Sequence, residues 1–140
     1  MKPLEHISLQ CIYCDDIRDE LGGKTTIVGW YGAENIQLPP DGPLMLSSLC
    51  MVGLIVMPLE LSYSSFKVEV MLGDVVFHSI NIPPEAFDQL LANGHGSSMG
   101  KQIRIAIRTT NLQVSDPCVL RLRIVIDGEE VSGNGLRFTR

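Results

Sequence analysis

The chain has 140 residues, of which 45% are hydrophobic, 6% aromatic and 19% charged, and its formal net charge is −5. This composition excludes a disordered chain, a collagen-like repeat and a coiled coil, and the length suits one soluble globular domain over residues 1–140. A chain of this length buries roughly two-thirds of the surface that its unfolded form exposes, so it can form a core without disulfides or metal ions.

The first predicted elements are two strands joined as a hairpin. Residues 7–14 are mostly apolar and stop at a polar corner that begins with Asp15 and Asp16. Residues 25–31 are rich in β-branched and aromatic side chains, which is typical of a half-buried strand. The pattern therefore predicts a hairpin with a long acidic connection.

The next part of the chain predicts a short strand, a loop and a buried strand. Residues 35–38 form the short strand, and the rigid proline-rich loop 39–43 ends it because proline cannot donate to a sheet ladder. The solidly apolar run 49–57 has nine residues, whereas a membrane-spanning helix needs about 20. A strand buried on both faces explains this length, and we expect no membrane contact.

A second hairpin and a helix follow. Residues 66–72 are apolar at alternate positions, which predicts a strand with one solvated face. Gly73-Asp74 suits a turn, after which residues 75–82 return as the second strand of the hairpin. Pro84 suits the first helical position and Asn93-Gly94 a helix end, so one short helix is predicted over residues 84–92.

The last part of the chain alternates most regularly. After a loop over residues 94–100, residues 103–108 and 119–126 place isoleucine and leucine on one face and arginine on the other. Asp127-Gly128 suits a tight turn, and the returning strand is interrupted by a flexible segment, Gly133-Asn134-Gly135. The fold class expected is mainly β: an antiparallel β-sandwich of about seven to nine strands with one short helix.

The cysteines do not form a recognisable metal site. Cys11 and Cys14 make one CxxC pattern, but it lies in a strand-like stretch, where residues three apart point to opposite faces. Cys50 and Cys118 have no close second ligand, which disfavours zinc. Because no export signal is recognised in the N-terminal residues, we expect a reducing compartment and four free thiols.

Other chemical sites are also disfavoured. The loop 94–101 ends in Gly-Lys but precedes a strand, whereas a phosphate-binding loop opens a helix. Calcium could bind the acidic side chains of residues 15–20, but Arg18 lies among them, and a solvated or salt-bridged corner is favoured. Ser98 lies in a Gly-x-Ser-x-Gly pattern over residues 96–100, but a nucleophile elbow leads from a strand into a helix, whereas this loop precedes a strand. An enzyme with a less obvious site is therefore only a weaker alternative. We expect no cofactor and no metal.

The basic side chains gather near the C-terminus. Residues 101–140 hold seven of the eleven lysines and arginines and only four acidic side chains. If the strands over residues 103–108 and 119–126 pair, one outer face carries a surface for a partner or an anion, formed by Arg104, Arg108, Arg121 and Arg123. The alternative is a solvated face with cross-strand partners. The pI of about 5.1 and the few aromatic residues disfavour nucleic acid.

The segment Cys-Asp-Asp-Ile-Arg-Asp-Glu-Leu-Gly-Gly-Lys over residues 14–24, with Gly29-Trp30-Tyr31-Gly32, resembles the opening of an uncharacterised family of small bacterial and phage-associated proteins. The resemblance covers residues 11–57. It implies a protein of the bacterial cytoplasm, or of the virion if it is phage-encoded, and it supplies no activity or catalytic residue. We interpret part of this segment as a structural corner, in which the glycines allow a tight turn and the arginine pairs with an aspartate. The corner residues are Asp15, Asp16, Arg18, Gly22 and Gly23.

The expected function is that of a non-enzymatic structural or interaction protein. It would assemble with itself or onto a larger bacterial or phage particle, as a head or tail accessory component, so a protein partner or a homo-oligomer is expected. The alternative is a small-anion or small-molecule binding or regulatory module that uses the arginine face. The loop 39–43 is the next candidate docking element.

Overall fold

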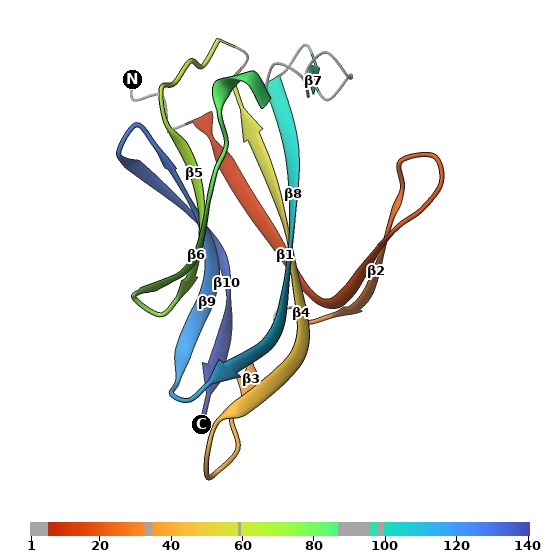
Figure 1. Cartoon of the computed structure of the whole chain (residues 1–140), viewed down its shortest axis with the longest axis vertical. Helices are drawn as coiled ribbons and strands as arrows, with labels where there is room; N and C mark the ends of the chain where they lie inside the picture. The colour runs from red at the N-terminus through yellow and green to blue at the C-terminus, as the bar shows by residue number, and fades with distance from the viewer. Residues whose placement is uncertain (1–5, 33–34, 59, 87–95, 98–99) are drawn as a thin grey trace.

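The computed structural model of the chain describes residues 6–32, 35–58, 60–86, 96–97 and 100–140. Over these residues ten strands form two five-stranded sheets that face each other (Figure 1). Eight of the strands have six residues or more. The expected fold class, mainly β with a sandwich-like arrangement of about seven to nine strands, is confirmed. Within the described residues, no helix is both long and apolar enough to cross a membrane.

The first sheet contains the N-terminal strands, in the order β2-β1-β4-β8-β7. Its strands are β1 (Ser8–Asp19), β2 (Thr25–Trp30), β4 (Leu44–Met57), β7 (Gly96–Ser97) and β8 (Gly100–Val114). All of its neighbouring pairs are antiparallel. The long pairing of β4 with β8 forms the centre of this sheet.

The second sheet has the order β3-β10-β9-β5-β6. Its strands are β3 (Ile36–Gln37), β5 (Phe66–Leu72), β6 (Val75–Asn81), β9 (Cys118–Ile126) and β10 (Glu129–Thr139). Both predicted tight hairpins, β5 with β6 and β9 with β10, are present in it. The short strand β3 pairs in parallel with the end of β10.

The core lies between the two sheets. Every second residue of β9 points into it, and Leu120 and Ile124 are completely buried. Leu49 and Ile55 of β4 meet them from the first sheet. Each such side chain contributes about 1.5–3 kcal/mol by leaving water, so this interior holds the sheets together. The prediction that residues 49–57 are buried on both faces is confirmed for residues 49–53, whereas Leu54 is half-buried and Val56 is 36% exposed.

Asn134 joins β10 of the second sheet to β1 of the first sheet by hydrogen bonds. The predicted flexible segment Gly133-Asn134-Gly135 is in fact a β-bulge inside β10, where the register with β9 shifts. The bulge turns Asn134 toward β1 of the other sheet: its Oδ1 accepts from Cys11 N at 2.7 Å and its Nδ2 donates to Cys11 O at 2.8 Å. The Tyr13 hydroxyl donates to Asn134 O at 2.7 Å. The Asn134 side-chain amide therefore bonds the backbone of Cys11 as a neighbouring strand would, and it links β10 of the second sheet to β1 of the first.

Several details differ from the sequence-based expectation. β1 does not end at Asp15 and Asp16 but continues to Asp19, so these residues belong to a strand and not to a corner. The solvated face predicted for β5 is partly covered, because Glu69 is buried beneath an arginine of β9. Residues 84–86 are helical as predicted, while residues 87–92 of the expected helix lie outside the described residues. The loop 94–101 is described only at residues 96–97 and 100–101.

Candidate functional site: a projecting hairpin arm

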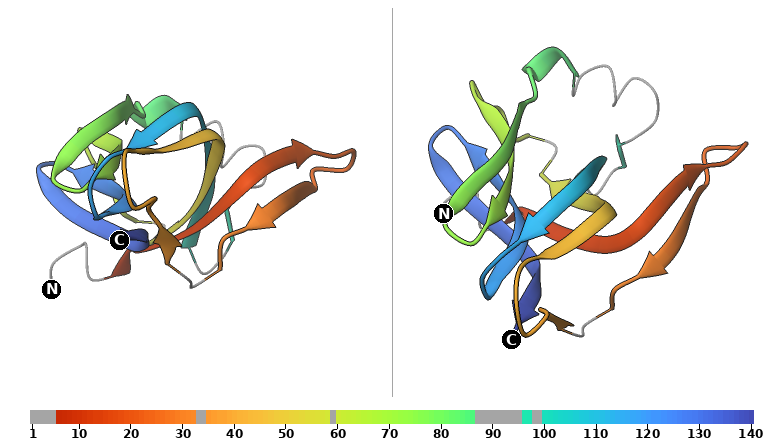
Figure 2. Two further views of the ribbon diagram at one scale, coloured as in Figure 1. Left: turned by 90° about the horizontal axis from the view of Figure 1, so that it is seen from below. Right: turned by 60° about the horizontal axis from the view of Figure 1, so that its bottom comes forward.

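The most distinctive feature of the molecule is an arm formed by β2 and the second half of β1. β1 pairs with β4 over residues 8–14 and with β2 over residues 14–19. Beyond Cys14, β1 therefore no longer pairs with β4 and continues away from the sandwich, paired only with β2. We call residues 15–31 the arm. It projects from the body in the views of Figures 1 and 2.

The turn at the arm tip explains two of the five predicted corner residues. Gly22 and Gly23 have φ values of +82° and +76°, which side chains other than glycine rarely adopt. Glu20 N donates to Lys24 O at 2.8 Å and closes the turn. The predicted hairpin is confirmed, but its connection is short, because the three aspartates expected in it belong to β1 and only Glu20 lies in the connection.

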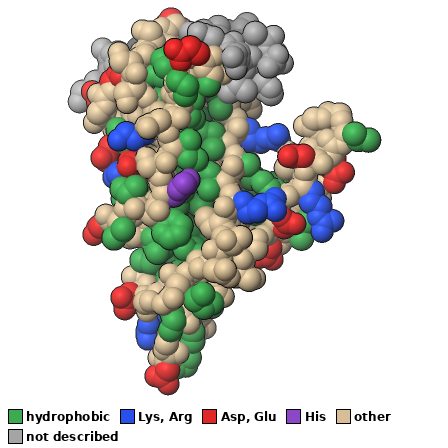
Figure 3. Space-filling model, in the orientation of Figure 1, with side chains coloured by type: hydrophobic (Ala, Val, Ile, Leu, Met, Phe, Trp, Pro, Cys, Tyr) green, Lys and Arg blue, Asp and Glu red, His purple; other side chains and the backbone are tan. Residues whose placement is uncertain are grey.

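The arm exposes apolar side chains. Leu21 at the tip is 96% exposed and Trp30 70%, and Ile27 and Val28 are also exposed. The expectation of a half-buried strand at residues 25–31 is wrong for most of its length, since five of the six residues of β2, the edge strand of the first sheet, are exposed. Figure 3 shows the arm standing apart from the body, with charged side chains along it and a hydrophobic side chain at its tip.

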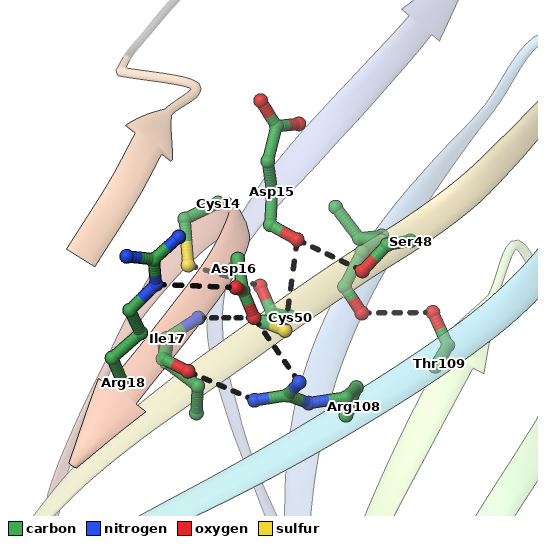
Figure 4. Close-up of polar contacts among 10 residues, drawn as sticks. Cys14, Asp15, Asp16, Ile17, Arg18, Ser48, Cys50, Arg108 and Thr109 are labelled. Atoms are coloured by element: carbon green, nitrogen blue, oxygen red, sulfur yellow. Dashed lines mark hydrogen bonds and ion pairs between the residues drawn. The ribbon is translucent and has the colours of Figure 1, made fainter. Parts of the chain in front are cut away.

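Side chains from the body hold the root of the arm where β1 leaves β4 (Figure 4). The Ser48 hydroxyl donates to Asp15 O at 2.9 Å, and Arg108 Nη2 donates to Ile17 O at 2.9 Å. Arg108 Nη1 also lies 3.1 Å from the Asp16 carboxylate. These contacts replace the ladder hydrogen bonds that β1 loses at the divergence, so the direction of the arm is set by specific bonds.

The base of β2 is shaped by a glycine. Gly29 has a φ of +68°, and a Cβ atom on it would lie 2.2 Å from Asp15 Oδ2. Only glycine leaves room there for the Asp15 carboxylate, which accepts the Tyr31 hydroxyl at 2.7 Å. Burial, and next the hydrogen bond to Asp15, raise the pKa of Tyr31 to about 12. The phenol therefore stays protonated and remains a donor that fixes the end of the arm.

The structure does not form the predicted arginine surface. β8 and β9 do not pair, so Arg104 and Arg108 lie on the first sheet and Arg121 and Arg123 on the second. The predicted alternation is present within each strand, but these two consecutive strands belong to different sheets. The face common to all four arginines is therefore absent.

Three of these four arginines have partners of their own, and those of Arg108 are the Ile17 carbonyl and the Asp16 carboxylate at the arm root. Arg104 contacts the Thr25 hydroxyl on β2. Arg123 lies opposite Glu69 in the register and bonds it at 2.8 Å, with Glu130 at 3.4 Å. The alternative expectation of cross-strand partners describes Arg123 well. Among the corner residues, Arg18 lies 3.8 Å from the Asp16 carboxylate, as the predicted pairing requires.

The four cysteines are free thiols, and all four belong to the described residues. Cys14 and Cys50 are register partners between β1 and β4, and both are completely buried. Burial raises the pKa of Cys11 to about 12 and also raises that of Cys14. No group of three or more potential metal ligands occurs within the described residues.

Sequence reasoning missed the arm itself, although a signal was present. Along β2, Ile27 falls on one face and Val28 and Trp30 on the other, and no charged residue lies between Thr25 and Trp30. A strand that is apolar on both faces needs cover on both faces.

Comparison with models of protein families, with curated proteins and with solved structures finds no match to this chain.

Proposed function

We propose that this protein is a non-enzymatic interaction protein that assembles through its hairpin arm. The observation that carries the proposal is the exposure of Trp30, Leu21, Ile27 and Val28 on an element that projects from the sandwich. Exposed apolar side chains that gather on one element are typical of protein contact sites. Tryptophan is also the residue type that most often dominates the binding energy of an interface.

The contacts at the arm root support the same function. A hairpin of two strands is barely stable alone in water, and it would sample many directions if it were joined to the body only by its backbone. Arg108, Ser48 and Arg104 instead hold it to the body by side-chain bonds. An arm that is already ordered loses less entropy when a partner binds, which favours tight association.

The alternative of a small-anion module has less support. It relied on four arginines on one face, whereas these side chains lie on two sheets, and Arg108 and Arg123 already bond carboxylates. A bacterial or phage particle as the larger assembly is part of the proposal and rests on the resemblance of residues 11–57. The arm supplies the physical means of attachment to such a particle.

The test is the native mass of complexes that contain the protein, measured by sedimentation in extracts of its source and after purification. Trp30→Asp should shift the protein from larger complexes toward the monomer, because a hot-spot tryptophan contributes about 2–4 kcal/mol to binding. Met45→Asp is the matched control, since Met45 is 53% exposed but lies on β4, outside the arm. Complexes that are unchanged in Trp30→Asp, with normal thermal unfolding, would refute the proposal.

A further inference from the structure

We infer that the arm binds a second copy of this chain, and that the two β2 strands pair antiparallel about a two-fold axis with Ile27 opposite Ile27. This inference rests on the proposed function, because it names the partner of the arm. Each arm would then become half of a continuous four-stranded sheet that joins two sandwiches. Symmetric pairs of this kind are the commonest form of protein oligomer.

The free edge of β2 lacks the side chains that usually prevent pairing. β2 is the last strand of the first sheet, so one side of its backbone has no neighbouring strand among the described residues. Natural edge strands are commonly guarded by charged side chains or proline. Thr25–Trp30 contains neither. Two identical strands can therefore meet along this edge without opposing like charges.

The hydrogen bonds at the arm root show which backbone groups face that edge. Ile17 O accepts from Arg108, on the side of β1 that faces away from β2. Ile17 is the register partner of Ile27. In an antiparallel ladder, when one residue of a pair directs its backbone groups outward, its partner does so too. Ile27 therefore presents its N–H and C=O to the free edge, and the strand period of two gives Thr25 the same orientation.

This orientation selects the register between the two copies. Outward backbone groups must meet outward groups, so odd-numbered residues of one β2 face odd-numbered residues of the other. Centring the axis on Ile27 keeps Gly29, whose φ of +68° departs from strand geometry, at the end of the ladder. Thr25 of one copy then lies opposite Gly29 of the other.

The same register brings complementary side chains together. Lys24 of one copy falls opposite Trp30 of the second copy, and both side chains are exposed in the single chain. An ammonium group over an indole ring is a favourable cation–π pair. Val28 and Trp30 of both copies share one face of the four-stranded sheet, which gives these apolar side chains common cover. The second copy thus supplies hydrogen-bond partners for the free backbone edge, an aromatic ring for Lys24 and cover for the apolar side chains of the arm.

The free edge of β6 in a neighbouring copy is the competing site for the arm. β6 is the last strand of the second sheet, and Val75, Val76 and Phe77 are exposed on it. However, β6 carries a bulge opposite Val70 and Met71, and bulges are a common device that blocks edge pairing. β6 also lacks the self-complementary partner that Lys24 and Trp30 provide in the arm.

A charge exchange at the axis tests the inference. Ile27→Asp and Ile27→Lys each place like charges opposite one another, so each variant alone should be mainly monomeric by analytical ultracentrifugation. Mixed in equal amounts, the two variants should associate about tenfold more tightly than either alone, because aspartate then faces lysine. Val76→Asp and Val76→Lys form the matched control pair on β6, and they should dimerise like the unmodified protein, alone or mixed.

The outcomes separate this inference from the proposed function. An unmodified purified protein that is monomeric at every concentration, while complexes in the extract still depend on Trp30, would overturn the second copy as partner and leave the proposed function standing. Loss of self-association in the Val76 variants would point to pairing of β2 with β6 and would also overturn the inference. Recovery of the dimer only in the mixed Ile27 variants would establish it.

Discussion

Replacing Asn134 by alanine should destabilise the whole sandwich, although the side chain lies in a loop-like bulge. The Asn134 amide makes two hydrogen bonds to the backbone of Cys11, at 2.7 and 2.8 Å, and thereby joins the second sheet to the first. Cys11 is buried, with 6% exposure, so its N–H and C=O have little access to water when the amide is removed.

The magnitude follows from these two bonds. A hydrogen bond contributes about 1 kcal/mol net, so Asn134→Ala should lower the free energy of unfolding by about 2 kcal/mol. For a domain of this length, 1 kcal/mol corresponds to about 4 °C in melting temperature, and a decrease of about 8 °C is expected. Asn134→Asp keeps an oxygen for Cys11 N but places a second oxygen against Cys11 O, so it should be no more stable than the alanine variant.

Thermal unfolding followed by circular dichroism, with urea unfolding at neutral pH as a second measure, checks this prediction. Asn81→Ala is the control, because Asn81 is an exposed residue of β6 and lies outside the β10 bulge that contains Asn134. Its melting temperature should change little, as expected for a surface substitution. If Asn134→Ala melts within about 2 °C of that control, the amide does not hold the sheets together and the reasoning fails.

Three further predictions concern the arm and the thiols. Gly29→Ala should loosen the arm by about 1–2 kcal/mol, because an alanine is strained at this φ and collides with Asp15, and hydrogen exchange should quicken in the arm amides only. Since folding raises the pKa of Tyr31 to about 12, its contribution to stability is complete below pH 10 and is lost as pH rises toward 12; Tyr31→Phe should flatten this alkaline decline in urea unfolding. Thiol titration of the denatured, unreduced protein should count four thiols. In the native protein Cys118, which is only partly buried, should react faster than the three buried thiols, although burial raises its pKa as it raises that of Cys11.

The local pattern of the sequence was sufficient wherever one strand and its own side chains decide the outcome. The alternation around Ile103 and around Leu122 predicted two strands and their buried faces, and the Asp127-Gly128 turn was also predicted. These features are readable because a strand places successive side chains on opposite faces whatever lies beside it. The apolar run of residues 49–57 likewise predicted a strand covered on both faces, which the structure confirms over residues 49–53.

Only the tertiary structure decided which strands are neighbours, and the candidate site depends on that choice. The sequence could not show that β8 and β9 enter different sheets, which separates Arg108 from Arg123. Nor could it show that β1 leaves β4 at Cys14, which turns Asp16 from a corner residue into part of an arm held by Arg108. Strand pairing joins residues far apart in the chain, and it is settled by packing and backbone hydrogen bonds across the whole molecule, whereas the period of two records only which face of a strand is buried.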